Sequence, residues 1–484
     1  MKKRTTYLDC GVFAICCCEY PNFSCCIDGT TGKTPKMLQS TSSSDTRNES
    51  THTIIINEGE EERNITKPSS SKADEPQLRH EAEDTVSLST SKGQVNPPAP
   101  ERKTKVLFLT GTRGLAALLV VVHHSHDFMP HMHLQLGAIG VDLFFVLSSY
   151  LLTWILMQKI QTLIAQGASY RTWALSLIDY FQRRLFRVYP LFFVTVIVVS
   201  FLTVKDQSLY FSVDHRRPPY DIVKTLMFDF QYRYHVFWTL PLEIAYYFVI
   251  PIFVFVVIKL RCLWWIAGLL LTVWIVKEGI FTGRRDHQPL KLHISTFFTG
   301  SMAAVVFIKM DSWIKKTSFI FRWWHTLFLR TVESLAILML LSVTFRGLVF
   351  TWVFENPFSH IKGVPYTSAY WAIIILIEMI KPSYISTMLE WNVLCTWGKF
   401  SFSIYLMHSF VVYNPVLKAQ TNYFDRLFSR LLLIFALSAT TYYLIEFPSL
   451  WMAKRVSRLI TNAVKRHSSK WTKLAGVERI RTQE

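Results

Sequence analysis

Two apolar segments that carry ionisable residues at bilayer depth constrain the fold of this chain more than any other feature. They lie in the stretch RGLAALLVVVHHSHDFMPHMHLQLGAIGVDLFFVLSSYLLT, which runs from Arg113 to Thr153. An ionisable group inside a membrane is costly unless it faces protein or water, and it marks a functional site by default. The segments are therefore predicted to be membrane helices whose charged residues face the interior of a bundle.

Arg113 and His124 are predicted to share one face of the first of these helices. They are eleven residues apart, which corresponds to about 1100° of helix and leaves them within about 20° of one another. Their separation along the axis is about 16 Å. His123 lies about 80° from this face, so the helical phase favours His124. One helix face then joins a cation near one membrane surface to an imidazole near the other.

The whole chain is typical of a polytopic membrane protein. Half of its 484 residues are hydrophobic and only 18% are charged, which is unusual for a soluble protein of this length. We predict an all-α bundle of about ten transmembrane helices. The expected spans are 107–127, 138–160, 185–204, 236–258, 262–278, 292–309, 332–353, 365–381, 401–417 and 427–447.

Polar tails flank the expected membrane domain of residues 106–453. Residues 1–105 hold six cysteines within the first 26 positions and then a Ser-, Thr- and Glu-rich stretch that we expect to be disordered. The cysteines lie beside basic residues, so they are either sites of S-palmitoylation or incidental. Residues 454–484 carry nine Lys or Arg against two Glu, and are expected to lie on an anionic cytoplasmic leaflet.

The positive charge of the chain is interpreted as a topology signal. The net charge is +18, but the basic residues flank apolar spans, and this argues against a nucleic-acid partner. The positive-inside rule places both termini in the cytoplasm and leaves the sequons at Asn22, Asn48 and Asn64 unused. The predicted outer loop from Lys205 to His235 contains five Lys or Arg and is the weak point of this topology. Either the plasma membrane or an endomembrane would fit.

Seven motifs in register carry a resemblance to a known family. They are RGLAALLVVVHH, GVDLFFVLSSYLLT, RRLFRVYP, FWTLPLE, FFTGSMAA, GKFSFSIYLMH and YYLIEFPSLWMAKR. Together they resemble membrane acyltransferase family 3, which includes bacterial polysaccharide O-acetyltransferases. The resemblance implies a ten-helix enzyme that transfers an acyl group, usually acetyl, from cytoplasmic acyl-CoA to a hydroxyl. It implies no permanently bound cofactor, because acyl-CoA is a co-substrate.

The resemblance assigns three arginines to the acyl-CoA donor. They are Arg113 in the first span and the Arg-x-x-Arg pair Arg184 and Arg187. A guanidinium stays charged and binds phosphate in a bidentate manner, which suits the phosphates of CoA. Arg184 and Arg187 could instead be positive-inside residues, which only mark the cytoplasmic end of the helix. For Arg183 that interpretation is preferred.

The catalytic residues implied by the resemblance are His124, Asp142 and Glu243. A hydroxyl is a poor nucleophile at neutral pH, so a base such as His124 must take its proton as it attacks the thioester. A carboxylate on the other ring nitrogen would fix the tautomer; Asp142 is the first choice and Glu243 the second. Asp142 could equally hold helices together through a buried pair. His408 also matches the family and is treated as structural or as part of the acceptor site.

Other features of the chain leave alternatives open. The loop histidines His126, His131 and His133 lack the spacing of a helical metal-binding pair, so no metal site is expected. Gly300 is expected to allow close helix packing. The acceptor could be a cell-wall sugar, a glycolipid, a sterol or a small metabolite, with the lipid bilayer as the surrounding partner. The alternative to an enzyme is a non-catalytic transporter or a degenerate scaffold of the same fold.

Overall fold

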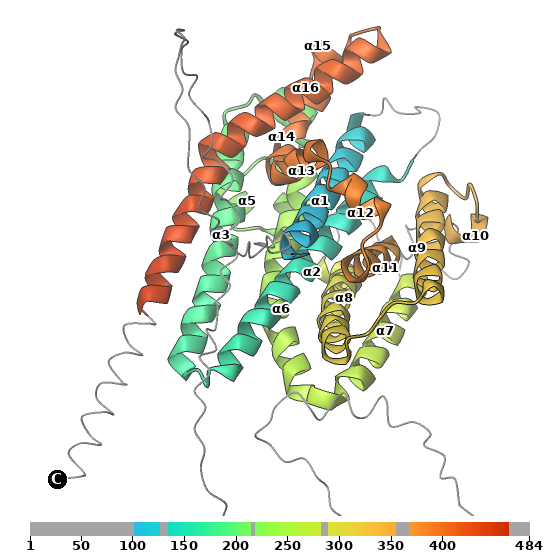
Figure 1. Cartoon of the computed structure of the whole chain (residues 1–484). Helices are drawn as coiled ribbons and strands as arrows, with labels where there is room; N and C mark the ends of the chain where they lie inside the picture. Colours follow the sequence, from blue (N-terminus) through green and yellow to red (C-terminus); the bar gives the residue numbers. More distant parts are fainter. Residues whose placement is uncertain (1–100, 126–133, 214–217, 282–288, 355–366, 464–484) are drawn as a thin grey trace, which may run out of the picture. The chain divides into compact units, whose positions relative to one another are not determined.

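A computed structural model describes residues 101–125, 134–213, 218–281, 289–354 and 367–463 of the chain. Within these ranges all regular secondary structure is helical (Figure 1). The predicted all-α class is confirmed. The cysteine-rich tail, the sequons, the histidines at 126, 131 and 133, and most of the basic C-terminal tail lie outside the described residues.

Each of the ten predicted spans overlaps a helix. These helices are α1 (Glu101–Ser125), α2 (Leu136–Ala165), α3 (Tyr170–Ser200), α6 (Thr239–Leu260), α7 (Trp264–Phe281), α8 (Leu290–Thr317), α9 (Trp323–Thr344), α11 (Thr367–Ile380), α14 (Ser401–Val412) and α16 (Tyr423–Thr441). Shorter helices connect or extend them: α4 (Val204–Phe211), α5 (Ile222–Leu226), η1 (Phe230–Tyr232), η2 (His235–Trp238), η3 (Arg261–Leu263), α10 (Thr351–Phe354), α12 (Tyr384–Leu389), α13 (Asn392–Lys399), α15 (Pro415–Lys418) and η4 (Tyr442–Glu446).

By length and composition, six helical segments of the described chain can cross a membrane, and two shorter apolar helices, α11 and α14, accompany them. The chain is therefore a multi-pass membrane protein. The predicted span 332–353 is displaced from α9, which ends at Thr344. Arg346 and Gly347 then adopt positive φ angles of 54° and 94° and turn the chain, although apolar residues continue beyond them.

Helix α1 packs between α2 and α13, and glycines set how closely it approaches α13 and α12. A Cβ atom on Gly398 of α13 would overlap the carbonyl of Thr110, and one on Gly111 would overlap the carbonyl of Leu389. Backbone therefore lies against backbone along this contact, as it does where small residues line helix interfaces in membranes. The close packing fixes the helix that carries Arg113 and His124.

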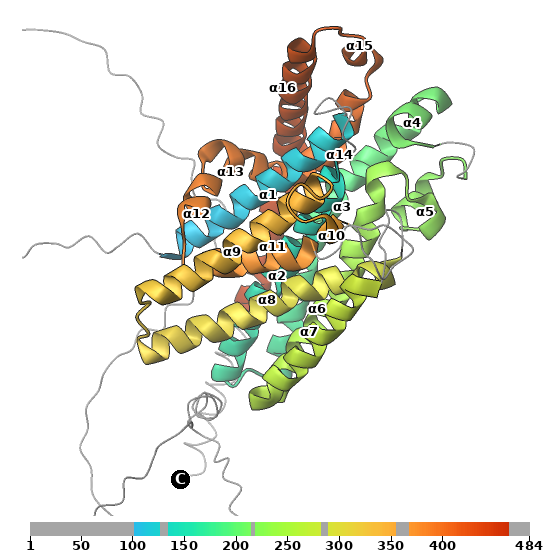
Figure 2. The same ribbon diagram turned by 90° about the vertical axis from the view of Figure 1, so that its right-hand side faces the viewer.

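Helices α7, α8, α11 and α9 lie side by side in that order (Figure 2), and α2 packs across α8 and α11. Gly300 of α8 faces α2, because a Cβ atom there would overlap the Ser149 hydroxyl and the Val146 carbonyl. The predicted packing role of Gly300 is confirmed. Ser149 donates to the Phe145 carbonyl at 2.8 Å, so its own polar group is satisfied within α2.

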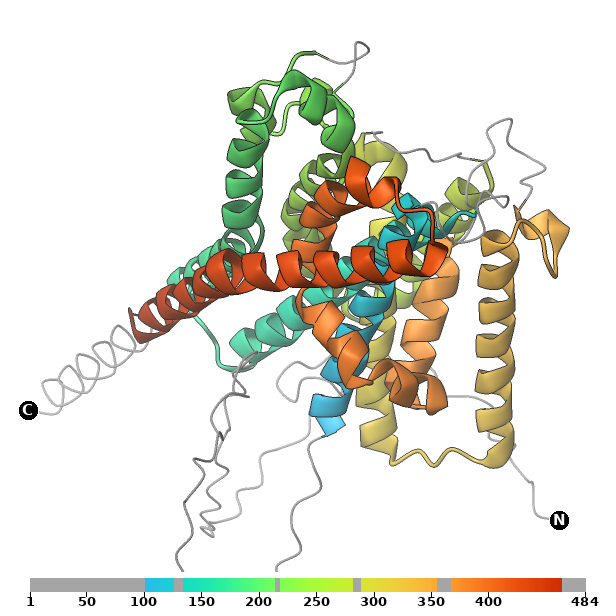
Figure 3. The same cartoon turned by 90° about the horizontal axis from the view of Figure 1, so that it is seen from above.

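The C-terminal helical segment runs from Tyr423 to Ala463 and crosses the other helices on one side (Figure 3). Its buried residue Arg430 donates a hydrogen bond of 3.1 Å to the carbonyl of Ser125, the last residue of α1. Near its other end, the carbonyl of Ala453 accepts a 3.3 Å hydrogen bond from Gln182 of α3. The segment therefore joins the end of α1 that bears His124 to the basic region of α3.

We expect Gly300→Ala to destabilise the protein by about 1 to 3 kcal/mol, because the added methyl group forces α8 away from the α2 backbone. Gly268→Ala on α7 is the matched control, since its Cβ would meet only the flexible tip of Met302. The measurement is the thermal transition of detergent-purified protein. Equal transition temperatures for the two variants would contradict the packing account.

Candidate functional site

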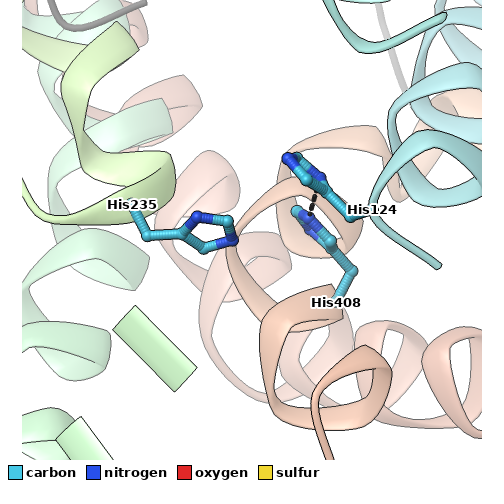
Figure 4. Close-up of side chains that lie close together, drawn as sticks. All are labelled: His124, His235 and His408. Carbon is cyan, nitrogen blue, oxygen red and sulfur yellow. Dashed lines mark hydrogen bonds between the residues drawn. The ribbon is translucent and has the colours of Figure 1, made fainter. Parts of the chain in front are cut away.

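Three histidines from distant parts of the chain meet at one point, and we call them the histidine cluster (Figure 4). His124 comes from the last turn of α1, His235 from the start of η2 and His408 from α14. One ring nitrogen from each lies within 4.8 Å of the others. His408 is fully buried, whereas His124 and His235 are half-buried. The cluster is thus partly exposed at His124 and His235 and buried at His408.

A hydrogen-bond chain fixes the protonation pattern of two of these rings. Nδ1 of His408 lies 3.1 Å from the Ile404 carbonyl, one turn earlier on α14. Since a carbonyl only accepts, this nitrogen carries the proton of His408. Nε2 of His408 lies 3.0 Å from Nδ1 of His124. When both rings are neutral, Nδ1 of His124 donates this bond, and Nε2 of His124 is the unprotonated nitrogen.

His235 is held in an unusual backbone conformation at the edge of the cluster. Its φ angle is 35°, a region that residues other than glycine rarely adopt and that is associated with functional sites. Its ring centroid lies 5.0 Å from that of His124 and 5.3 Å from that of Tyr413. One turn later, Thr239 donates a 2.9 Å hydrogen bond to the hydroxyl of Tyr405, which ties η2 and α6 to α14.

A second feature is a cavity lined by Arg113, Arg184 and Arg187, which we call the arginine cavity. The side chains come from α1 and α3. Apolar residues of α2, including Phe144 and Phe145, line another part of the wall. Three guanidinium groups beside an apolar wall form a suitable environment for a molecule that is anionic at one end and apolar at the other.

Carboxylates accompany the arginines. Glu243 lines the arginine cavity and accepts a 2.9 Å hydrogen bond from Tyr247. Glu446, almost fully buried, accepts one of 2.8 Å from Ser403 and lies within electrostatic reach of Arg187 and Arg113. Glu446 ends the π-helical turn η4, and such turns are frequent at functional sites. Sequence reasoning quoted its motif but did not single it out.

The arginine cavity and the histidine cluster are built on the same helices. Helix α1 carries Arg113 in the cavity and His124 in the cluster. On α14, Tyr405 lines the cavity and His408 joins the cluster one turn later. Thr239, which lines the cavity, likewise follows His235 by four residues. Each connection is rigid, so the two features keep a fixed relative position.

The structure separates the predicted carboxylates. Glu243 lies with the arginines. Asp142 is buried in α2, and its carboxylate accepts a hydrogen bond from Thr367 of α11. That bond joins two helices, which is the structural role considered as an alternative. The partnership of either carboxylate with His124 stays a prediction.

Arg183 does not line the arginine cavity. Its guanidinium donates to Asp179 at 3.1 Å, one turn earlier on α3, and also to Ser457. Asp179 is bound in addition by Lys159 of α2 at 2.8 Å. Arg183 therefore docks the start of α3 against the C-terminal helical segment, whereas Arg184 and Arg187 point to the cavity.

The histidine cluster is also the group of described residues that could hold a metal ion. Sequence reasoning predicted no metal site, either at the loop histidines 126, 131 and 133 or at the N-terminal cysteines. It did not single out His235, since no sequence spacing relates His124, His235 and His408. The position of His235 two residues before the motif FWTLPLE was the one available signal.

Comparison with known proteins gives two kinds of relative. The O-acetyltransferase OatA of Staphylococcus aureus (strain NCTC 8325 / PS 47) is 31% identical over 103 residues, which is 21% of this chain and 15% of the relative. The Bacillus subtilis (strain 168) protein named "Putative peptidoglycan O-acetyltransferase YrhL" is 25% identical over 372 residues, covering 70% of this chain and 54% of the relative. The chain thus spans at most about half the length of these relatives. No solved structure matches it.

The family model described as "Acyltransferase domain" matches residues 106–447. This range contains α2 to α16 and all but the first residues of α1, and with them the histidine cluster and the arginine cavity. The chain belongs to membrane acyltransferase family 3.

Proposed function

We propose that this protein is an integral membrane O-acyltransferase that transfers an acetyl group from acetyl-CoA to a hydroxyl of a glycan or lipid acceptor. One observation carries the proposal: a hydrogen-bonded histidine pair shares two helices with a cavity lined by three arginines. His408 lies one turn from the cavity-lining Tyr405 on α14, and His124 lies eleven residues beyond Arg113 on α1. Family membership supports the reaction class. The named activity of the Bacillus subtilis relative supports a glycan acceptor.

In the proposed reaction His124 is the general base. Its Nε2 takes the proton of the acceptor hydroxyl as the oxygen attacks the thioester carbonyl. The tetrahedral intermediate then expels the CoA sulfur, and the imidazolium returns the proton to that sulfur. The ester product and CoA thiol leave, and His124 is neutral again, so no permanently bound cofactor is required.

His408 takes the positioning role that sequence reasoning gave to a carboxylate. By accepting from Nδ1 of His124, it keeps Nε2 of His124 unprotonated, so that this nitrogen can accept the proton of the acceptor hydroxyl. Glu243 and Glu446 act on the donor side, where they hold the guanidinium groups in place. Asp142 fixes α2 against α11.

The proposed orientation places the N-terminus and the donor on the cytoplasmic side. Arg113 lies nearer the start of α1 than His124 does, so the arginine cavity lies closer than the histidine cluster to the side on which α1 begins. The phosphates of CoA bind there, and the pantetheine arm extends toward the histidine cluster. The acceptor hydroxyl approaches from the opposite side of the membrane.

The function is tested with purified full-length protein, radiolabelled acetyl-CoA and a total extract of native membrane lipids and glycans. We expect label to enter the extract, and His124→Ala to slow this transfer by about 10²- to 10⁴-fold, the usual contribution of a general base. His123→Ala is the matched control and should retain most activity. Absence of transfer by the unmodified protein would favour a transporter or scaffold.

We expect Arg184→Gln and Arg187→Gln each to raise the KM for acetyl-CoA by about tenfold or more, because each removes a charge-assisted hydrogen bond to phosphate. Arg183→Gln carries the same change outside the arginine cavity and should leave the KM unaltered. Steady-state kinetics with varied acetyl-CoA measure both. A larger effect in Arg183→Gln than in the other two would contradict the assignment.

His408→Gln should retain more activity than His408→Leu. The glutamine carbonyl can still accept from Nδ1 of His124, whereas leucine leaves that donor without this acceptor. We expect kcat to fall by at least about tenfold in the leucine variant, with the KM for acetyl-CoA little changed. Identical kcat values in two equally stable variants would show that His408 does not position His124.

A further inference from the structure

We propose that the histidine cluster is a binding site for a zinc-class transition metal ion, and that an ion bound there inhibits acyl transfer. The cluster offers three imidazole nitrogens within 4.8 Å of one another. The inhibitory effect rests on the proposed function, whereas metal binding itself does not. No sequence spacing relates the three residues, since they come from α1, η2 and α14.

The ligand geometry is close to that of a three-histidine zinc site. Zinc–nitrogen bonds of about 2.0–2.1 Å in a tetrahedron place the ligand nitrogens about 3.4 Å apart. The nitrogens of His124 and His408 are already 3.0 Å apart. The third, from His235, lies within 4.8 Å of both, and its ring points toward the pair (Figure 4). A shift of at most about 1.4 Å, the difference between 4.8 Å and about 3.4 Å, completes the set.

The surroundings of His408 are those of a metal ligand. Its Nδ1 donates to the Ile404 carbonyl, and a second-shell bond of this kind fixes the tautomer and orients the other nitrogen toward a metal. That other nitrogen, Nε2, is the one that faces His124. His408 is fully buried, so its ring is held rigidly.

The chemistry of the donors selects the class of ion. Imidazole ligands suit Zn²⁺, Cu²⁺ and Ni²⁺, whereas Mg²⁺ and Ca²⁺ require oxygen ligands. A three-nitrogen set leaves a fourth tetrahedral position for water. His124 and His235 are half-buried, so an ion from solution can reach this position.

Metal binding would inactivate the proposed base through its tautomer. A neutral His124 has one ring proton, which the hydrogen bond to His408 keeps on Nδ1. When a metal ion takes the lone pair at Nδ1, the proton resides on Nε2, the nitrogen that must accept the hydroxyl proton. Coordination through Nε2 would block the base directly. The ion and the acceptor proton therefore compete for the same imidazole.

Equilibrium dialysis of purified full-length protein against zinc chloride tests binding without reference to activity. We expect the protein to bind zinc and excess Mg²⁺ not to displace it. His235→Asn should bind zinc at least about tenfold more weakly, because removing a metal ligand lowers metal affinity no less than removing a group that orients such a ligand. Asparagine tolerates the positive φ angle at this position, so the variant should fold. His325→Ala, which removes an imidazole from α9, is the control and should bind zinc normally.

The second measurement is the ratio of acetyl transfer with and without zinc, taken separately for each variant. We expect zinc to lower acetyl transfer by the unmodified protein and by His325→Ala, and a chelator to restore it. Transfer by His235→Asn should be at least about tenfold less sensitive to zinc.

Equal zinc affinity in His235→Asn and the unmodified protein would overturn the site. Transfer that is lost on chelation and restored by zinc would overturn the inhibitory role. If no transfer is detected at all, dialysis still decides the metal site, while the proposed function fails.

Discussion

The hydrogen bond between His124 and His408 is the interaction on which the rest of the candidate site depends. It joins the end of α1 to α14 inside a bundle of apolar helices, where polar groups must satisfy one another. Because His408 is already committed to the Ile404 carbonyl, the bond has one direction when both rings are neutral. A neutral imidazole thus orients another, and no buried carboxylate charge is needed for that task.

The fold places this pair in a fixed relation to the arginine cavity. Helix α1 is held against α12 and α13 by glycine contacts, and its end is bound by Arg430 of α16. Helix α14 and the η2–α6 segment each run from the cavity to the cluster and are joined by the bond between Thr239 and Tyr405. Preorganisation of this kind is what positions two substrates for a transfer reaction.

Properties that depend on local periodicity could be predicted from the sequence. The phase of α1 predicts that Arg113 and His124 share one face, and each predicted apolar window overlaps a helix, although the window 332–353 is displaced from α9. The contacts between distant segments could not be predicted in this way. Nothing local indicates that Glu243 lies with the arginines, that Thr367 bonds to Asp142, or that His235 faces His124. These contacts depend on how helices cross, which one sequence does not specify.

The proposed site has a donor end and a base, and the most direct test separates the two in one variant. Equilibrium binding of radiolabelled CoA to His124→Ala measures the donor end when the base is absent. We expect His124→Ala to bind CoA with the affinity of the unmodified protein and to lose acetyl transfer. Loss of CoA binding in this variant would contradict the proposed site, because His124 would then hold the donor rather than activate the acceptor.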